Sequence, residues 1–469
     1  MAKAAKPKPK AKRKRTVQSF PILNPHAAGI DIHADQHWVA VPPGSTPDDP
    51  NQSHDFPPEV RKFGACTPDL EAIADWLKRC GVTSVAMEST GVYWIPLFEL
   101  LEQRGFQVLL VDPRQTRQVT GRPKSDRLDC QWIRRLHSCG LLAASFRPAD
   151  DIVVLRGYRR QRQRLIEDAV RQVHHIQKAL EEMNVKLTEV VSDVMGVTGM
   201  AIIKAILGGE RDAKKLAALR HVGCKRTESE IARALKGVWR NEHLFALKQA
   251  VEVYEKYQKM LIECDKQIEE CLMSFADKSG GAKLPPKPRR KGRKANDPRF
   301  DVRKLLHRMS GMDLTIIEGI DATTALALTS EIGLEVSKFP SAKHFTSWLG
   351  LCPNHQSSAG KIKSRHVRRG ANRAAKAFRL AAQGCHHAKH ALGAFYRRIQ
   401  GRCGGPVAVV ATARKIAERV YRLLKYGEVY VRQEAAAYEE NYRRRVLKGL
   451  TKRAAELGYC LTAKAESSE

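Results

Sequence analysis

The chain has 469 residues, enough for about three domains, and its 43% hydrophobic content excludes a wholly disordered protein. Lysine and arginine number 82 against 50 aspartate and glutamate, so the formal net charge of +32 favours a polyanionic partner such as nucleic acid. The eleven cysteines include no C-x-x-C pair, the N-terminus lacks the apolar core of a signal peptide, and no apolar run is long enough to span a membrane. These features predict a cytoplasmic protein with free thiols and exclude a zinc ribbon.

Strand-like and helix-like segments alternate in the first third of the chain, after a basic N-terminal tail. AAGIDIHADQHWVAV predicts two strands joined by a turn, and TSVAMES and FQVLLVD predict two more. DLEAIADWLKRCG and YWIPLFELLEQRG predict helices that end at glycines, and SDRLDCQWIRRLHSCG predicts a helix with Ser125 as its N-cap. This order predicts an α/β domain of RNase H-like fold.

Four acidic residues stand out in this domain, at Asp31, Glu88, Asp126 and Asp129. The first lies in a predicted strand, the second ends another, and the last two lie three residues apart on one face of a predicted helix. Carboxylates brought together at one end of a sheet repel each other unless a cation neutralises them. The hard, oxygen-preferring Mg²⁺ fits this need, so the pattern predicts a Mg²⁺-dependent phosphodiester-processing site.

The middle of the chain is helical. Two apolar seams of coiled-coil type flank a basic insert, GGERDAKKLAALRHVGCKRTESEIARALKGVWR, and predict either an antiparallel hairpin, a dimerising stalk, or helices packed within one subunit. The first seam runs through Ile166, Val170, Val173, Ile176, Leu180, Met183, Leu187, Val190 and Val194, and the second through Leu247, Val251, Tyr254, Tyr257, Leu261, Cys264, Ile268 and Leu272.

A basic stretch rich in proline and glycine, SGGAKLPPKPRRKGRKANDP, predicts a flexible linker after the helical region. Beyond it, LTIIEGIDATTALALTSEIG resembles a helix-hairpin-helix, an element whose turn amides contact phosphate in nucleic-acid complexes. Asp321 replaces the second turn glycine, which favours a structural role for this element over direct DNA contact.

The loop HQSSAGK combines two serines with small residues and a following cluster of cations. Small residues let a backbone approach phosphate, and cations neutralise it, so the loop suits either a serine nucleophile or an ordinary turn. The cations expected to contact nucleic acid here are Lys361, Arg365, Arg368, Arg369 and Arg373, and those beside the acidic pair are Arg122, Lys124 and Arg127.

The motifs GIDIH, AMESTGVYW, KSDRLD, SWLGLCPNHQSSAGK and RGANRAAKAFRLAAQG, in this order, resemble the insertion-sequence 110 family of DEDD transposases. Some members are known as bridge-RNA-guided recombinases. The resemblance extends from about residue 25 to 430 and implies that the four carboxylates are the family's Mg²⁺ ligands on a RuvC-like domain. It also implies that Ser358 is the nucleophile of the C-terminal transposase domain. The family's Gly-Gly after this serine is Ala359-Gly360 here, and the adjacent Ser357 keeps the choice of serine open.

The resemblance implies a transposase of a bacterial insertion sequence, associated with the nucleoid, that cleaves and exchanges DNA strands through a serine–DNA intermediate. Its implied partners are donor and target DNA, an element-encoded bridge RNA and further copies of the chain in a dimer or tetramer. The expected divisions are a basic disordered tail (1–24), a RuvC-like catalytic domain (25–148), a coiled-coil region with a basic insert (149–278), a basic linker (279–309), a mostly helical transposase domain with the serine (310–435) and a basic helical tail (436–469).

Two other functions remain open: a RuvC-like structure-specific endonuclease that uses water as nucleophile, and a non-catalytic nucleic-acid-binding scaffold. The histidines in GCHHAKH have helical spacing but no carboxylate to complete a metal site, which favours a solvated helix face. His33, two residues after Asp31, lies either beside the acidic site or on the surface of its strand.

Overall fold

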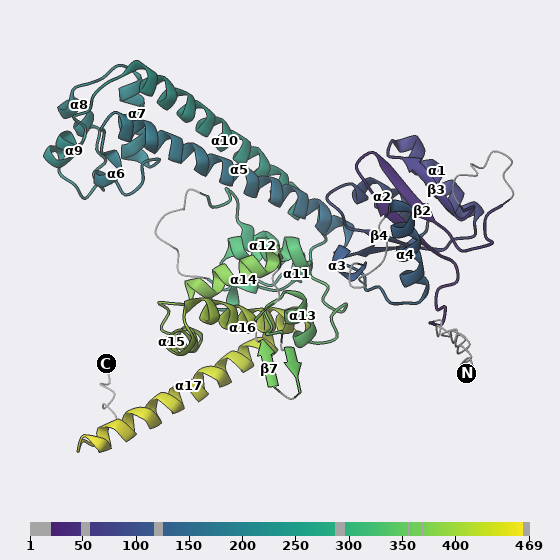
Figure 1. The fold of residues 1–469 in the computed structure, drawn as a ribbon. Helices are drawn as coiled ribbons and strands as arrows, with labels where there is room; N and C mark the ends of the chain where they lie inside the picture. Colours follow the sequence, from purple (N-terminus) through teal and green to yellow (C-terminus); the bar gives the residue numbers. More distant parts are fainter. Residues whose placement is uncertain are drawn as a thin grey trace, which may run out of the picture. The chain divides into compact units, whose positions relative to one another are not determined.

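The computed structural model describes residues 20–47, 57–116, 125–286, 296–354, 356–359, 361–364, 366–367, 370 and 372–462. The chain forms two compact units, Met1–Arg147 and Pro148–Glu469, and each is described by itself. The first unit contains a mixed β-sheet together with helices, and the second unit is mostly helical (Figure 1). This confirms the predicted combination of an α/β N-terminal part with a helical remainder.

A five-stranded sheet in the order β3-β2-β1-β4-β5 forms the centre of the first unit. Strand β2 is antiparallel to its neighbours β1 and β3, whereas β1, β4 and β5 are parallel to each other. The strands are β1 Ala27–Ile32, β2 Gln36–Ala40, β3 Val60–Gly64, β4 Ser84–Glu88 and β5 Gln107–Val111. The helices of this unit are α1 Thr67–Arg79, α2 Trp94–Gln103, α3 Pro113–Thr116 and α4 Asp126–Ser138.

Helices cover both faces of this sheet, which explains why every residue of β1 is buried. Apolar residues of α1 and α2 form one core with Ile30 and Ile32 of β1. On the opposite face, Cys130 and Ile133 of α4 pack against residues of β2, β4 and β5. The strand ends at the carboxyl side of β1 and β4 therefore lie next to the beginning of α4.

Two long helices, α5 Asp150–Glu182 and α10 Asn241–Ser274, lie side by side in the second unit (Figure 1). They are antiparallel, because Arg162 near the start of α5 pairs with Asp265 near the end of α10. A small lobe joins their other ends and contains α6 Leu187–Val190, α7 Val197–Leu207, α8 Ala213–Ala218 and α9 Glu228–Ala234. Of the predicted arrangements, the chain by itself forms the antiparallel hairpin.

The first predicted seam is wrong in two respects. Helix α5 ends at Glu182, where Asn184 adopts a left-handed backbone with φ of 54°, so the seam does not continue through Leu187 and Val194 as one helix. In the middle of α5 the buried residues are Leu165 and Ala169, one position before those predicted. The burial of Arg162 on the same stripe explains the error, because a charged residue gives no apolar signal.

The rest of the second unit is a bundle of helices with a two-stranded hairpin. Its elements are α11 Val302–Ser310, η1 Leu314–Ile316, α12 Ala322–Ile332, α13 Ala342–Trp348, β6 Gln356–Ser358, β7 Lys361–Ser364, α14 Arg373–Gly384, α15 Ala391–Cys403, α16 Gly405–Tyr426 and α17 Glu428–Glu456. Asp321 caps α12 by accepting a hydrogen bond from the amide of Thr324 at 2.8 Å. The boundary predicted between residues 435 and 436 falls inside α17, which continues without a break.

None of the described helices combines the length and the apolarity needed to cross a bilayer. All eleven cysteines are unpaired, as the absence of a disulfide pattern in the sequence predicts.

Candidate active site

Asp31 and Glu88 lie together at the carboxyl ends of two parallel strands. Ile30 of β1 is the register partner of Met87 of β4, so the next residue on each strand points to the same face of the sheet. Burial raises the pKa of Asp31 above its ordinary value; His33 opposes this effect, and the negative charges of Glu88 and Asp126 add to it. The site therefore contains a carboxylate whose charged form needs a positive neighbour.

Helix α4 delivers the two remaining carboxylates. The side chain of Ser125 accepts a hydrogen bond from the amide of Leu128 at 3.3 Å and caps the helix, so Asp126 and Asp129 lie in the first turn as predicted. The helix approaches β1 closely at Gly29, where an added Cβ would lie 2.2 Å from the amide nitrogen of Arg134. A glycine at this position of GIDIH therefore lets α4 pack against the strand that carries Asp31.

His33 lies between the aspartates of the strand and the helix. Its Nε2 is 3.2 Å from Oδ2 of Asp31 and 3.7 Å from Oδ1 of Asp126. One ligand atom from each of these residues lies within 4.8 Å of the others, and no other group of this kind occurs in the described part of the chain. Two carboxylate oxygens and one imidazole nitrogen are suitable ligands for a divalent cation. A bound cation would also neutralise the charge of the buried Asp31 carboxylate, which is unfavourable without a positive partner. The residues present fit a metal site.

The other two acidic residues are not part of this three-residue group. The single hydroxyl proton of Thr116 in α3 is shared between two acceptors, Oε1 of Glu88 and the carbonyl of Pro113. The carbonyl of Thr116 accepts a hydrogen bond from Trp132 of α4 at 3.0 Å. Thr116 therefore fixes Glu88 and connects it to the helix that carries the aspartates. No recognisable motif marks this threonine, which follows the last predicted strand.

Ser358 occupies the last position of β6, at the tip of the two-stranded hairpin. It is the register partner of Lys361, and Ser357 is the partner of Ile362, so the two serines point to opposite faces of the hairpin. Both are exposed, and among the described residues neither hydroxyl has a hydrogen-bond partner. Ala359, which follows Ser358, adopts a left-handed backbone with φ of 49°, a conformation that favours glycine.

The structure describes only some of the predicted nucleic-acid contacts. Lys361 and Arg373 are exposed and Arg127 is half-buried. The other predicted cations lie outside the described residues, namely Arg122, Lys124, Arg365, Arg368 and Arg369, as does most of the basic N-terminal tail.

The histidines of GCHHAKH do not form a metal group among the described residues. The rings of His386 and His387 contact each other, with their centroids 4.2 Å apart. His390 caps α15, and its Nδ1 accepts a hydrogen bond from the amide of Gly393 at 3.3 Å.

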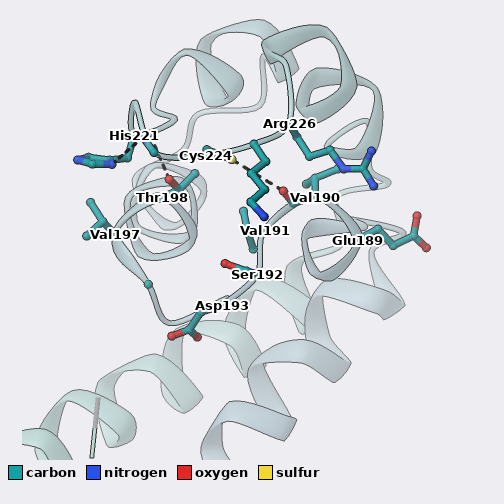
Figure 2. Close-up of a pocket in the computed structure, with 13 residues that line it drawn as sticks. Glu189, Val190, Val191, Ser192, Asp193, Val197, Thr198, His221, Cys224 and Arg226 are labelled. Carbon is teal, nitrogen blue, oxygen red and sulfur yellow. Dashed lines mark hydrogen bonds between the residues drawn. The ribbon is translucent and has the colours of Figure 1, made fainter. Parts of the chain in front are cut away.

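A pocket of about 460 Å³ opens in the lobe at the end of the hairpin (Figure 2). The loop before α7, with Ser192 and Asp193, faces the loop between α8 and α9, with Cys224 and Arg226. The hydroxyl of Thr198 accepts a hydrogen bond from the amide of His221 at 3.0 Å and joins the beginning of α7 to the loop between α8 and α9. The pocket contains none of the predicted catalytic residues and is lined by charges of both signs.

Carboxylates clustered at the strand ends of a mixed sheet are consistent with the nuclease-like fold of DEDD transposases. A family model of IS110-type DEDD transposases matches residues 28–185, and a model described as "Transposase IS116/IS110/IS902 family" matches residues 312–397. The chain belongs to the IS110 family of transposases.

One similar protein is the insertion element IS110 uncharacterized 43.6 kDa protein of Streptomyces coelicolor. It is 32% identical over 130 residues, and the match covers 27% of this chain and 31% of that protein. The first family match contains all four predicted carboxylates and the second contains Ser358.

Proposed function

We propose that this protein is the DNA transposase of a bacterial insertion sequence and acts by Mg²⁺-dependent strand cleavage and exchange. The observation that carries the proposal is the group formed by Asp31, His33 and Asp126 at the end of an α/β sheet. It occurs in a chain whose second family segment contains an exposed serine in a hairpin. A metal site for phosphate and a nucleophile are the two parts that this chemistry needs.

Asp31, Glu88, Asp126 and Asp129 would hold the metal on an RNase H- or RuvC-like domain. When bound, Mg²⁺ stabilises the negative charge that develops on the phosphate during displacement. The carboxylates supply the hard oxygen ligands that Mg²⁺ prefers over nitrogen. Thr116 keeps the Glu88 carboxylate in place, and His33 orients the carboxylates of the two neighbouring aspartates.

Ser358 is the proposed nucleophile. Its Oγ forms a bond to phosphorus, the bond from phosphorus to the 3′-oxygen breaks, and the proton lost by the serine is balanced by one gained at the free 3′-hydroxyl. Attack of a 3′-hydroxyl on the phosphoserine reverses this step and joins new strands without an external energy source. The proposed partners are donor and target DNA, an element-encoded bridge RNA that pairs with both, and further copies of the chain. The net charge of +32 is suited to such polyanions.

The test is a recombination assay in bacteria with a plasmid that carries the element's two ends. Asp31→Asn, Glu88→Gln and Ser358→Ala are expected to abolish recombination, and Ser357→Ala is the matched control that should keep most of it. If both serine variants lose recombination while Ser358→Ala still nicks DNA, the result favours an endonuclease that uses water as its nucleophile. Full activity of Asp31→Asn would leave only a non-catalytic binding role. Sequencing of RNA that copurifies with the protein tests the guide, and absence of a specific short RNA would overturn that part.

A further inference from the structure

Three arginines on one turn of α5 face a single carboxylate of α12. Arg160 donates two hydrogen bonds to the carboxylate of Glu331, at 2.9 and 2.6 Å. Arg156 donates to the backbone carbonyls of Ser330 and Glu331, at 3.1 and 2.7 Å. Glu331 is only 6% exposed, and these bonds pair its carboxylate with Arg160 and its backbone carbonyl with Arg156.

Arg159 is the third arginine and is left incompletely paired. Its Nη1 is 3.8 Å from the Glu331 carboxylate, and among the described residues its guanidinium makes no hydrogen bond, although the side chain is only 20% exposed. Burial lowers the pKa of Arg159, Glu331 opposes this effect, and the charges of Arg160 and Arg373 add to it. A half-buried guanidinium with free donors and like charges beside it is costly unless an anion binds.

Arg373 extends the positive cluster from a second direction. It is the first residue of α14, which packs against α12, and its side chain is exposed. Arg156, Arg159 and Arg160 lie 3.6, 3.8 and 2.6 Å from one carboxylate, which leaves a formal excess of two positive charges, and the charge of Arg373 also acts on Arg159. The planar, always-charged guanidinium groups match phosphate oxygens, which makes a phosphodiester the ligand of best chemical fit.

We infer that Arg159 of α5 and Arg373 of α14 together hold one phosphate of the DNA strand on which the protein acts. DNA is favoured over RNA because α14 belongs to the same family segment as the Ser358 hairpin and begins nine residues after β7 ends. The inference rests on the proposed function, since the strand that reaches the serine is the proposed substrate. In this role the two arginines are positioning residues.

The experiment measures binding of fluorescein-labelled duplex DNA from the element's end by anisotropy, over a range of salt concentrations and without Mg²⁺. Arg159→Gln and Arg373→Gln should each weaken binding by on the order of tenfold and lower the slope of log K against log salt by about one. The double variant should lose less than the product of the two single effects, because both side chains hold one phosphate. Arg171→Gln is the matched control on α5, since that side chain is 73% exposed and pairs with Asp168.

Affinity and salt slope equal to those of Arg171→Gln in both variants would overturn the inference. Weaker binding of an RNA duplex of the same length, with unchanged DNA binding, would overturn the assignment to DNA. If Arg159→Gln has a lower melting temperature than the wild type, the DNA affinities of Arg159→Lys and of the exposed Arg373→Gln test the inference instead. Arg159→Lys should then retain part of the DNA affinity. Because the assay reads binding without Mg²⁺, its outcome is separate from that of the Ser358 recombination test. If Ser358→Ala remains active in recombination but the arginine variants bind DNA more weakly, the phosphate site is supported although the proposed nucleophile is wrong.

Discussion

Replacement of Gly29 by alanine tests whether the packing of α4 on β1 assembles the metal site. The added Cβ would lie 2.2 Å from the Arg134 nitrogen and 2.5 Å from the Cys130 carbonyl oxygen, both of which are backbone atoms of α4. Ordinary contact begins at 3.4 Å, so α4 must move by about 1 Å. Overpacking against a backbone costs about 3 kcal/mol, which corresponds to a fall of roughly 6–12 °C in the melting temperature of this unit.

The same shift moves Asp126 away from Asp31, and metal–ligand distances tolerate only about 0.2 Å. Gly29→Ala should therefore melt earlier and also bind Mn²⁺ more weakly, as measured by differential scanning fluorimetry and by electron paramagnetic resonance of free Mn²⁺. Gly157→Ala in α5 is the matched control, because nothing lies within 4 Å of its added Cβ and alanine favours a helix by about 1 kcal/mol. Wild-type stability and Mn²⁺ affinity in Gly29→Ala would show that the contact between α4 and β1 does not assemble the metal site.

Three further predictions concern stability. Asp31→Asn removes a buried charge and should stabilise the protein in EDTA by about 1 kcal/mol while abolishing activity; a lower melting temperature would contradict this. Arg162→Ala leaves Asp265 buried and should cost about 3–5 kcal/mol in urea denaturation, whereas a loss under 1 kcal/mol would mean that the pair is solvated. Burial lowers the pKa of His137 below its ordinary value of about 6.5. The free energy of unfolding should therefore decrease as the pH decreases from about 6.5 to the folded-state pKa, by at most about 1.4 kcal/mol per pH unit. His137→Gln should flatten the dependence of melting temperature on pH between 7 and 5, and an unchanged slope would argue against it.

The sequence predicted most of the elements that carry the acidic residues. Apolar alternation marked β1 and β2, glycines marked the ends of α1 and α2, and Ser125 marked the beginning of α4. These signals depend only on neighbouring residues in the sequence, so they can be recognised without knowledge of the fold. Strand β3 was not predicted, because VRKFG is a short edge strand with two charged residues and little apolar alternation.

The parts of the site that depend on tertiary contact could not be read from the sequence. The place of His33 between two aspartates depends on how closely α4 approaches β1, and the role of Gly29 depends on the same contact. The hydrogen bond from Thr116 to Glu88 joins residues 28 positions apart. The pairing of Arg162 with Asp265 joins residues 103 apart, and it places a charged residue on the buried stripe of α5, before the first residue of the predicted seam.

A covalent-capture experiment shows whether Ser358 of the hairpin bonds to DNA with the help of the acidic site. Labelled DNA from the element's end is incubated with the protein and Mg²⁺, denatured, and separated, and the adduct is digested for mass spectrometry. We expect a labelled protein band whose nucleotide remnant lies on Ser358, present in Ser357→Ala and absent from Ser358→Ala and Glu88→Gln. Nicked DNA with no protein attached, or a remnant on Ser357, would contradict it.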